Sequence, residues 1–177
     1  MSVTEEIRLR FLPARVSVLF VGESPPAGGT FFYNANSKLY EATREAFRIA
    51  APDLVRGQNF LDAFQALGCF LDDLCLEPVN HLKLDNPLAK SKRLHKRVEG
   101  EAALAARLAE WKPSELVVVM LAIEENVRRA AATAGLATKL NKLPFPGRPQ
   151  HRERFVDELV PMLKRFRGRG LLLTRSL

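Results

Sequence analysis

Two kinds of hydrophobic pattern alternate along the chain: short continuous apolar runs, and longer stretches in which apolar residues recur every three or four positions. Continuous runs bounded by glycine, proline or charged residues are typical of buried strands. In the run at 69–76, the adjacent Asp72 and Asp73 are unusual for a buried element. We predict strands or extended segments over residues 16–21, 69–76, 116–123, 138–143 and, at the edge of the sheet, 171–174.

The periodic stretches predict helices, because their apolar residues fall on one helical face. Asn36 or Ser37 can cap the first helix, which Pro52 ends, and Gly68 and Gly135 can act as left-handed caps of later ones. The predicted helices cover residues 39–50, 60–67, 87–111, 124–134 and 150–166.

The helix predicted at 87–111 is basic in its first half and rich in alanine and leucine in its second half. Gly100 is its weak point, because glycine lowers helix stability. Its predicted apolar stripe comprises Leu94, Val98, Leu104, Leu108 and Trp111.

Strands that alternate with helices at this spacing indicate an α/β protein. We therefore predict a single domain over residues 1–177, a three-layer α/β/α sandwich around a central, mainly parallel four-stranded sheet. Functional loops in such folds follow the carboxyl ends of the strands. Three segments meet this rule: residues 22–33, the Asp72–Asp73 region and residues 144–152.

Length and composition exclude several classes of protein. The longest apolar run, Leu116–Ile123, is far shorter than the roughly 20 residues that span a bilayer. The opening residues hold no apolar segment, so we expect no secretory signal. The two cysteines form no CxxC pair and the three histidines share no ligand spacing, which argues against a disulfide scaffold, a zinc finger or another metal site. We expect a cytoplasmic protein that is a monomer and binds no membrane.

Charge is distributed unevenly. Residues 1–78 hold 7 Lys and Arg against 10 Asp and Glu, whereas residues 79–177 hold 20 against 10. Five of these cations lie within residues 90–97. A basic half of this kind suits a polyanion such as DNA, although a solvated basic face is the common alternative.

The loop after the first strand, GESPPAGGTFFY at 22–33, is the richest in candidate chemistry. Gly22 allows a sharp turn and two prolines stiffen the loop, which would hold Glu23 and Ser24 rigidly at the strand end. The segment contains neither the phosphate-binding pattern GxxxxGK[ST] nor the hydrolase pattern GxSxG. The alternative is a tight strand-to-helix turn that carries an exposed glutamate.

The strings VLFVGESPP at 18–26 and GTFFYNANSKLY at 29–40 resemble the first motif of the uracil-DNA glycosylase superfamily. The similarity is greatest to the branch that reads G-E-A/G-P-G and then G-K-P-F-V-G-R-A-G-K-L-L. Gly22, Glu23 and Pro25 match directly, and Phe32 falls on the aromatic residue that stacks on the flipped base. Residues 70–75 and 143–152 fall, by position, where the family has its pocket strand and its minor-groove loop.

The sequence also departs from the family pattern. Ser24 stands where several branches carry a catalytic Asp or Asn, and Phe145 replaces the histidine of the third motif. Similar branches hold an iron–sulfur cluster on four cysteines, which Cys69 and Cys75 alone cannot build. We expect no cofactor.

The third departure is Asp73, where the family's pocket asparagine reads the uracil edge. An ionised carboxylate would repel uracil O4 and suit the amino group of cytosine better. Either burial protonates Asp73, or another residue such as Asn80 reads the base.

The resemblance implies hydrolysis of the N-glycosidic bond of a deoxyuridine flipped out of single- or double-stranded DNA, the first step of base excision repair. Glu23 would orient water or stabilise the cationic sugar, with Ser24 beside it in the catalytic turn. Gly22, Pro25, Phe32, Tyr33 and Asp73 or Asn80 would bind the base. The alternatives are a non-catalytic nucleic-acid-binding protein of this fold and a glycosylase for another deaminated base. The expected DNA-binding residues are Lys92, Arg93, Lys96, Arg148, His151 and Arg152.

Overall fold

The computed structural model describes residues 2–172 and contains one parallel sheet of four strands. The strands are β1 (Val18–Gly22), β2 (Cys69–Asp73), β3 (Glu115–Val118) and β4 (Lys139–Lys142), in the order β2-β1-β3-β4. All three neighbouring pairs are parallel, and the register aligns Gly22 with Asp73. This confirms the predicted α/β sheet.

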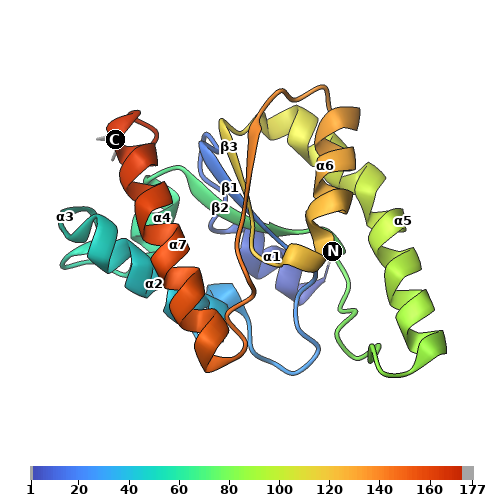
Figure 1. Cartoon of the computed structure of the whole chain (residues 1–177). Helices are drawn as coiled ribbons and strands as arrows, with labels where there is room; N and C mark the ends of the chain where they lie inside the picture. The colour runs from blue at the N-terminus through green and yellow to red at the C-terminus, as the bar shows by residue number, and fades with distance from the viewer. Residues whose placement is uncertain (1, 173–177) are drawn as a thin grey trace.

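Helices cover both faces of the sheet (Figure 1). On one side lie α2 (Lys38–Ala50), α3 (Pro52–Val55), α4 (Phe60–Ala66) and α7 (Pro149–Gly168). On the other side lie α5 (Pro87–Trp111) and α6 (Glu124–Thr133). The N-terminal helix α1 (Val3–Leu9) lies beside β2, where Arg8 reaches Asp72. Two short 3-10 helices, Phe32–Asn34 and Leu121–Ile123, follow β1 and β3. The three-layer α/β/α arrangement is as predicted.

The helix boundaries follow from local side-chain chemistry. Ser37 accepts a hydrogen bond from the Tyr40 backbone N–H at the start of α2, and Asn86 caps α5 in the same way. Gly68 and Gly135 have positive φ angles after α4 and α6, as expected of left-handed caps. The sequence patterns did not predict the short helices α1 and α3 or the two 3-10 helices.

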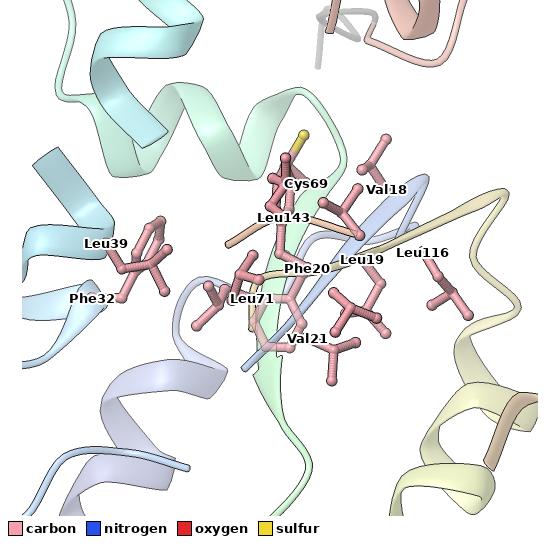
Figure 2. Close-up of a cluster of buried hydrophobic side chains, with 14 of the residues drawn as sticks. Val18, Leu19, Phe20, Val21, Phe32, Leu39, Cys69, Leu71, Leu116 and Leu143 are labelled. Carbon is pink, nitrogen blue, oxygen red and sulfur yellow. The ribbon is translucent and has the colours of Figure 1, made fainter. Parts of the chain in front are cut away.

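Strand β1 is at the centre of the hydrophobic core, with all five residues buried. Figure 2 shows that Val18 and Phe20 point to one side of the sheet and Leu19 and Val21 to the other. Each fully buried side chain of this size stabilises the fold by roughly 1.5–3 kcal/mol. Burial on both faces explains why β1 is a continuous apolar run rather than an alternating one.

The first half of α5 differs from its predicted amphipathic stripe. Leu94 and Val98 are 45% and 55% exposed, whereas Arg93 and Arg97 are buried. The predicted weak point, Gly100, has a packing role, because a Cβ atom there would lie 2.5 Å from the carbonyl oxygen of Leu74. The buried face of this half of α5 therefore carries two arginines, and at Gly100 the helix lies close to the backbone of Leu74.

Two strand predictions were too long and one is not borne out. Strand β2 ends at Asp73, and β3 ends at Val118 before a 3-10 helix. Leu171 and Leu172 are not in a strand, and the rest of the predicted edge strand, 173–174, lies outside the described residues.

Within residues 2–172, no helix is both long and apolar enough to span a bilayer.

Candidate functional site

A cleft of about 650 Å³ opens at the carboxyl ends of β1 and β2. This is the edge of the sheet where the alternating topology predicts functional loops. The cleft brings together seven of the eight predicted catalytic and base-binding residues, namely Gly22, Glu23, Ser24, Pro25, Phe32, Asp73 and Asn80.

Backbone and side-chain hydrogen bonds join the loops that follow β1 and β2. The Cys75 N–H donates to the Glu23 carbonyl oxygen at 2.8 Å, and the Val79 N–H donates to Ser24 Oγ at 3.1 Å. The Ala27 N–H donates to Asn80 Oδ1 at 3.0 Å. These bonds fix both loops relative to each other, so the cleft is formed before any ligand enters.

Glu23 lies at the centre of a buried ion cluster. Its carboxylate accepts hydrogen bonds from Arg93 Nε at 2.7 Å and from Arg97 Nε at 2.7 Å, and the Arg93 Nη2 group contacts its second oxygen. Arg93 also donates to the carbonyl oxygen of Leu82, and Arg97 to that of Ala122. Glu23 therefore connects the loop after β1 to the segments around Leu82 and Ala122.

The pKa of Glu23 is lowered by this cluster. Burial acts to raise the pKa, but hydrogen bonds and positive charge from Arg93 and Arg97 outweigh it. A carboxylate that is held ionised by two guanidinium groups is a weak proton acceptor. This geometry suits positioning of the loop better than proton abstraction from water. The alternative of a turn with an exposed glutamate is wrong, because Glu23 is 8% exposed.

Asp73 is also buried in the cleft wall, but without a partner for its side chain. Within residues 2–172, no group donates a hydrogen bond to its carboxyl, although Arg107 donates to its backbone carbonyl oxygen. The side chain fits only because residue 22 is glycine, since a Cβ atom there would lie 2.5 Å from Asp73 Oδ1. The neighbouring Gly22 thus allows Asp73 to approach the base of the turn.

The adjacent aspartates differ because successive side chains of a strand point to opposite faces. Asp72 points away from the cleft and pairs with Arg8 at 2.7 Å and Arg107 at 2.6 Å. Burial, and then the negative charge of Asp72, raise the pKa of Asp73 to about 7. Asp73 is therefore about half protonated near pH 7 and largely protonated in mildly acidic solution, in line with one of the two hypotheses from the sequence.

Phe32 and Phe31 both line the cleft and are nearly buried. Tyr33 does not line it, and its predicted role in binding a base is not supported. Its hydroxyl group donates to the Leu71 carbonyl oxygen and accepts from the Leu71 N–H, at 2.9 and 2.8 Å. Tyr33 therefore anchors the aromatic segment to β2, and its ring packs edge-on against Phe32.

The loop before α7 supplies the opposite part of the cleft. Phe145 is 45% exposed and lines the cleft. Lys38 at the start of α2 donates to the Gly147 carbonyl oxygen at 2.9 Å and holds this loop beside the aromatic segment. The role of Lys38 as a tie between distant loops could not be read from the sequence.

The predicted DNA-binding residues fall into two groups. Arg93 is buried against Glu23 and is not free to contact a phosphate, so this prediction is wrong. Arg152 pairs with Glu45 at 2.5 Å. The remaining four have exposed side chains: Lys92, Lys96, Arg148 and His151.

Arg97 was not among the predicted site residues, although it binds Glu23 as directly as Arg93 does. The available signal was the spacing of the two arginines, since residues four apart on a helix share one face. Their place in a strongly basic run instead favoured solvent-exposed side chains.

Comparisons with known proteins add no relative: the chain matches no protein-family model and no curated protein. Within residues 2–172, no cluster of three or more His, Cys, Asp or Glu side chains could hold a metal ion. The chemistry of the cleft must therefore be argued from its own residues.

Proposed function

We propose that this protein is a DNA glycosylase that hydrolyses the N-glycosidic bond of a deoxyuridine flipped out of DNA. The reacting bond is inaccessible in stacked DNA, so the nucleotide must leave the helix and enter a cleft. A cleft of about 650 Å³ that is lined by Phe31, Phe32 and Phe145 suits a planar base.

One observation carries the proposal. The first motif, at 18–26 and 29–40, resembles the glycosylase family in sequence, and the segments 70–75 and 143–152 correspond to it by position; all three contribute side chains to the same cleft. The first supplies Glu23 and Phe32, the second Asp73 and the third Phe145. Loops at the carboxyl ends of parallel strands meet at one edge of the sheet in any such fold. The resemblance adds that the turn at Gly22–Pro25 and Phe32, which it assigns to the active site, line this cleft.

The chemistry of the reaction suggests a role for each group. The sugar gains positive charge as the base leaves, and the base carries negative charge. Glu23, whose charge is balanced by Arg93 and Arg97, would hold the catalytic turn in position, and Phe32 would stack on the base. Ser24 Oγ accepts a hydrogen bond from the Val79 N–H, which leaves its own proton available to a ligand or to water.

The direct test is a cleavage assay with end-labelled oligonucleotides that contain uracil, hypoxanthine, xanthine or a thymine mismatch, in single- and double-stranded form. Alkali converts an abasic site into a strand break, so breaks at uracil that appear only after alkali support the proposal. Glu23→Gln protein, purified in the same way, controls for contaminating glycosylases. Breaks at another base alone would change the substrate.

A second candidate function follows from the ion cluster. Because Arg93 and Arg97 occupy the Glu23 carboxylate, a protein that binds DNA without cleaving it would also fit this cleft. Binding of the same oligonucleotides with no alkali-dependent break at any base would favour this alternative and overturn the glycosylase.

A further inference from the structure

A hollow of about 560 Å³, separate from the cleft, lies between α2 and the turn that joins α3 to α4. Three arginines surround it: Arg44 and Arg48 come from successive turns of α2, and Arg56 comes from the turn after α3. No Asp or Glu side chain of residues 2–172 lines this arginine hollow. Its lining therefore carries positive charge without negative charge.

The side chains of these three arginines are exposed, and none of them donates a hydrogen bond to another residue within 2–172. The neighbouring carboxylates on α2 and α3 have other partners, since Glu45 pairs with Arg152 at 2.5 Å and Asp53 pairs with Arg167 at 2.7 Å. Glu41, which is also on α2, lines the cleft and not the hollow. The guanidinium donors of the hollow are therefore available to a ligand.

The surroundings of the hollow add order and further donors. The Arg44 guanidinium lies over the Tyr40 ring, 5.6 Å from its centre, a contact that leaves the in-plane N–H donors available. Gly57, Gln58 and Asn59 line the hollow in the turn, where Gly57 has a φ of +75°. Their backbone N–H groups donate to no other described residue. Such N–H groups and guanidinium groups together suit an anion with several oxygens.

We propose that the arginine hollow is a binding site for phosphate groups, separate from the cleft. A phosphate group carries up to two negative charges and several acceptor oxygens, so it can bind more than one guanidinium at the same time. A carboxylate carries one charge and two oxygens, and it satisfies three arginines less well. The site itself does not depend on the proposed function of the cleft.

Two sources of phosphate fit this chemistry. One is the backbone of a DNA strand, because a single helix connects the two sites: α2 contributes Lys38 and Glu41 to the cleft and Arg44 and Arg48 to the hollow. The other source is a small phosphorylated molecule, which a hollow of about 560 Å³ can admit. The exposed lysines of α5 lie on the other side of the sheet and belong to a different surface (Figure 1).

The test compares the intact protein with two triple variants that remove the same charge. The hollow variant carries Arg44→Gln, Arg48→Gln and Arg56→Gln. The control variant carries Arg15→Gln, Lys112→Gln and Lys139→Gln, which replace exposed cations at the amino ends of strands. Circular dichroism verifies that all three proteins are folded, which we expect because the replaced side chains are exposed.

The first measurement is calorimetric titration with inorganic phosphate at constant ionic strength, with acetate as the control anion. We expect the parent to bind phosphate more tightly than acetate, the hollow variant to lose at least about tenfold in phosphate affinity, and the control variant to change little.

The second measurement distinguishes the two sources. It records fluorescence anisotropy of labelled single-stranded DNA at several salt concentrations. If the ligand is a DNA backbone, the hollow variant should reduce the slope of log affinity against log salt by about 2, since each single-strand phosphate contact contributes about 0.7. If the slopes of the two triple variants agree and only phosphate binding differs, the ligand is a small phosphorylated molecule.

The proposal is overturned if the two triple variants behave alike in both titrations, because the three arginines then act only as surface charge. Binding of acetate by the parent as tightly as phosphate would also overturn it. Neither result bears on cleavage of uracil DNA in the cleft, which the alkali assay tests separately.

Discussion

Glu23 directly follows β1 and Asp73 ends the adjacent β2. Both are buried, at 8% and 4% exposed, but their electrostatic surroundings are opposite. Glu23 is bound by two arginines of α5, and its pKa is lowered. The Asp73 carboxyl has no cationic partner within residues 2–172, and its pKa rises to about 7. Burial alone therefore does not decide the charge of a carboxyl group in this cleft, and the presence of a partner does.

The difference arises from which faces of α5 and β2 meet. Arg93 and Arg97, one helical turn apart, both reach the turn after β1. Arg107, farther along α5, meets β2 at the face that carries Asp72. Strand alternation turns Asp73 to the other face, beside Leu71 and the aromatic wall. The Glu23 carboxyl is therefore held ionised by its arginine partners, whereas the Asp73 carboxyl has no such partner among the described residues and is more easily protonated.

The largest expected effect comes from removing the paired carboxylate. Glu23→Gln leaves two buried guanidinium groups without their counter-ion, and we expect it to lower the free energy of unfolding by about 3–5 kcal/mol. Urea unfolding at pH 7 measures this. The control is Glu99→Gln, which removes an exposed pair with Lys96 within α5 and should change the free energy of unfolding much less. Equal losses in the two variants would mean that the ion cluster contributes no more than a surface pair.

The second prediction concerns the unpaired carboxyl. The pKa of Asp73 is about 7 in the folded protein, against 3.8 for an unperturbed aspartate side chain, so the folded state binds the extra proton between these values. Asp73 therefore lowers the free energy of unfolding as pH rises from about 4 to about 7. Each pKa unit is worth about 1.4 kcal/mol, so Asp73→Asn should exceed the parent in stability by up to about 4 kcal/mol at pH 8.

Urea unfolding of parent and Asp73→Asn between pH 4 and 8 tests this, with Asp53→Asn as the control. Asp53 is a surface carboxylate paired with Arg167, and its pKa is lowered by that hydrogen bond. The stability difference of Asp53→Asn from the parent should not shift in favour of the variant as pH rises. A constant difference between Asp73→Asn and the parent would show that Asp73 does not titrate in this range.

The third prediction asks which of two buried phenylalanines, Phe32 or Phe31, stacks on a bound base. Phe32 and Phe31 are both buried and both line the cleft, so truncation of either to alanine would also destabilise the fold. Phe32→Leu keeps most of the volume but removes the aromatic face. We expect it to weaken uracil binding by about 1–3 kcal/mol, the usual value of base stacking, and Phe31→Leu to weaken it less. Calorimetry at pH 5.5 distinguishes them, and equal losses would reject Phe32 as the stacking residue.

The fold was predictable because its signals are local. The apolar runs at β1 and β3, the caps at Ser37 and Gly68 and the range of α5 all follow from neighbouring residues. The turn after β1 was predictable for the same reason, since glycine and proline restrict backbone geometry wherever they occur.

The pairing of charges was not predictable in this way. The interactions of Glu23 with Arg93 and Arg97 join residues about 70 positions apart, and a basic run looks the same whether its side chains face solvent or a buried carboxylate. Tyr33 was misassigned because an aromatic residue in a cleft loop gives no sequence sign that its hydroxyl group bonds to the Leu71 backbone. Such contacts depend on the tertiary arrangement of the sheet and α5.

The smallest expected effect tests whether the solvent-exposed face of α5 binds DNA, while the buried face of the same helix binds Glu23. Arg93 and Arg97 face Glu23, whereas Lys92 and Lys96 are exposed beside them. If this face contacts DNA phosphates, Lys92→Gln with Lys96→Gln should weaken binding to all sequences and reduce the slope of log affinity against log salt by about 2, roughly one for each contact. Stability should change little, because neither lysine is buried.

The matched control neutralises Arg15 and Lys139, two exposed cations at the amino ends of strands, on the opposite edge of the sheet from the cleft. This control removes the same net charge, so any difference between the two double variants reports where the cations lie and not how many there are. Fluorescence anisotropy with labelled duplex and single-stranded DNA, at several salt concentrations, gives the slopes. If both double variants lower the slope equally, the basic half of the chain attracts DNA without a defined path. A lower slope only for the lysine pair would place the DNA backbone along α5, next to the two carboxyl groups.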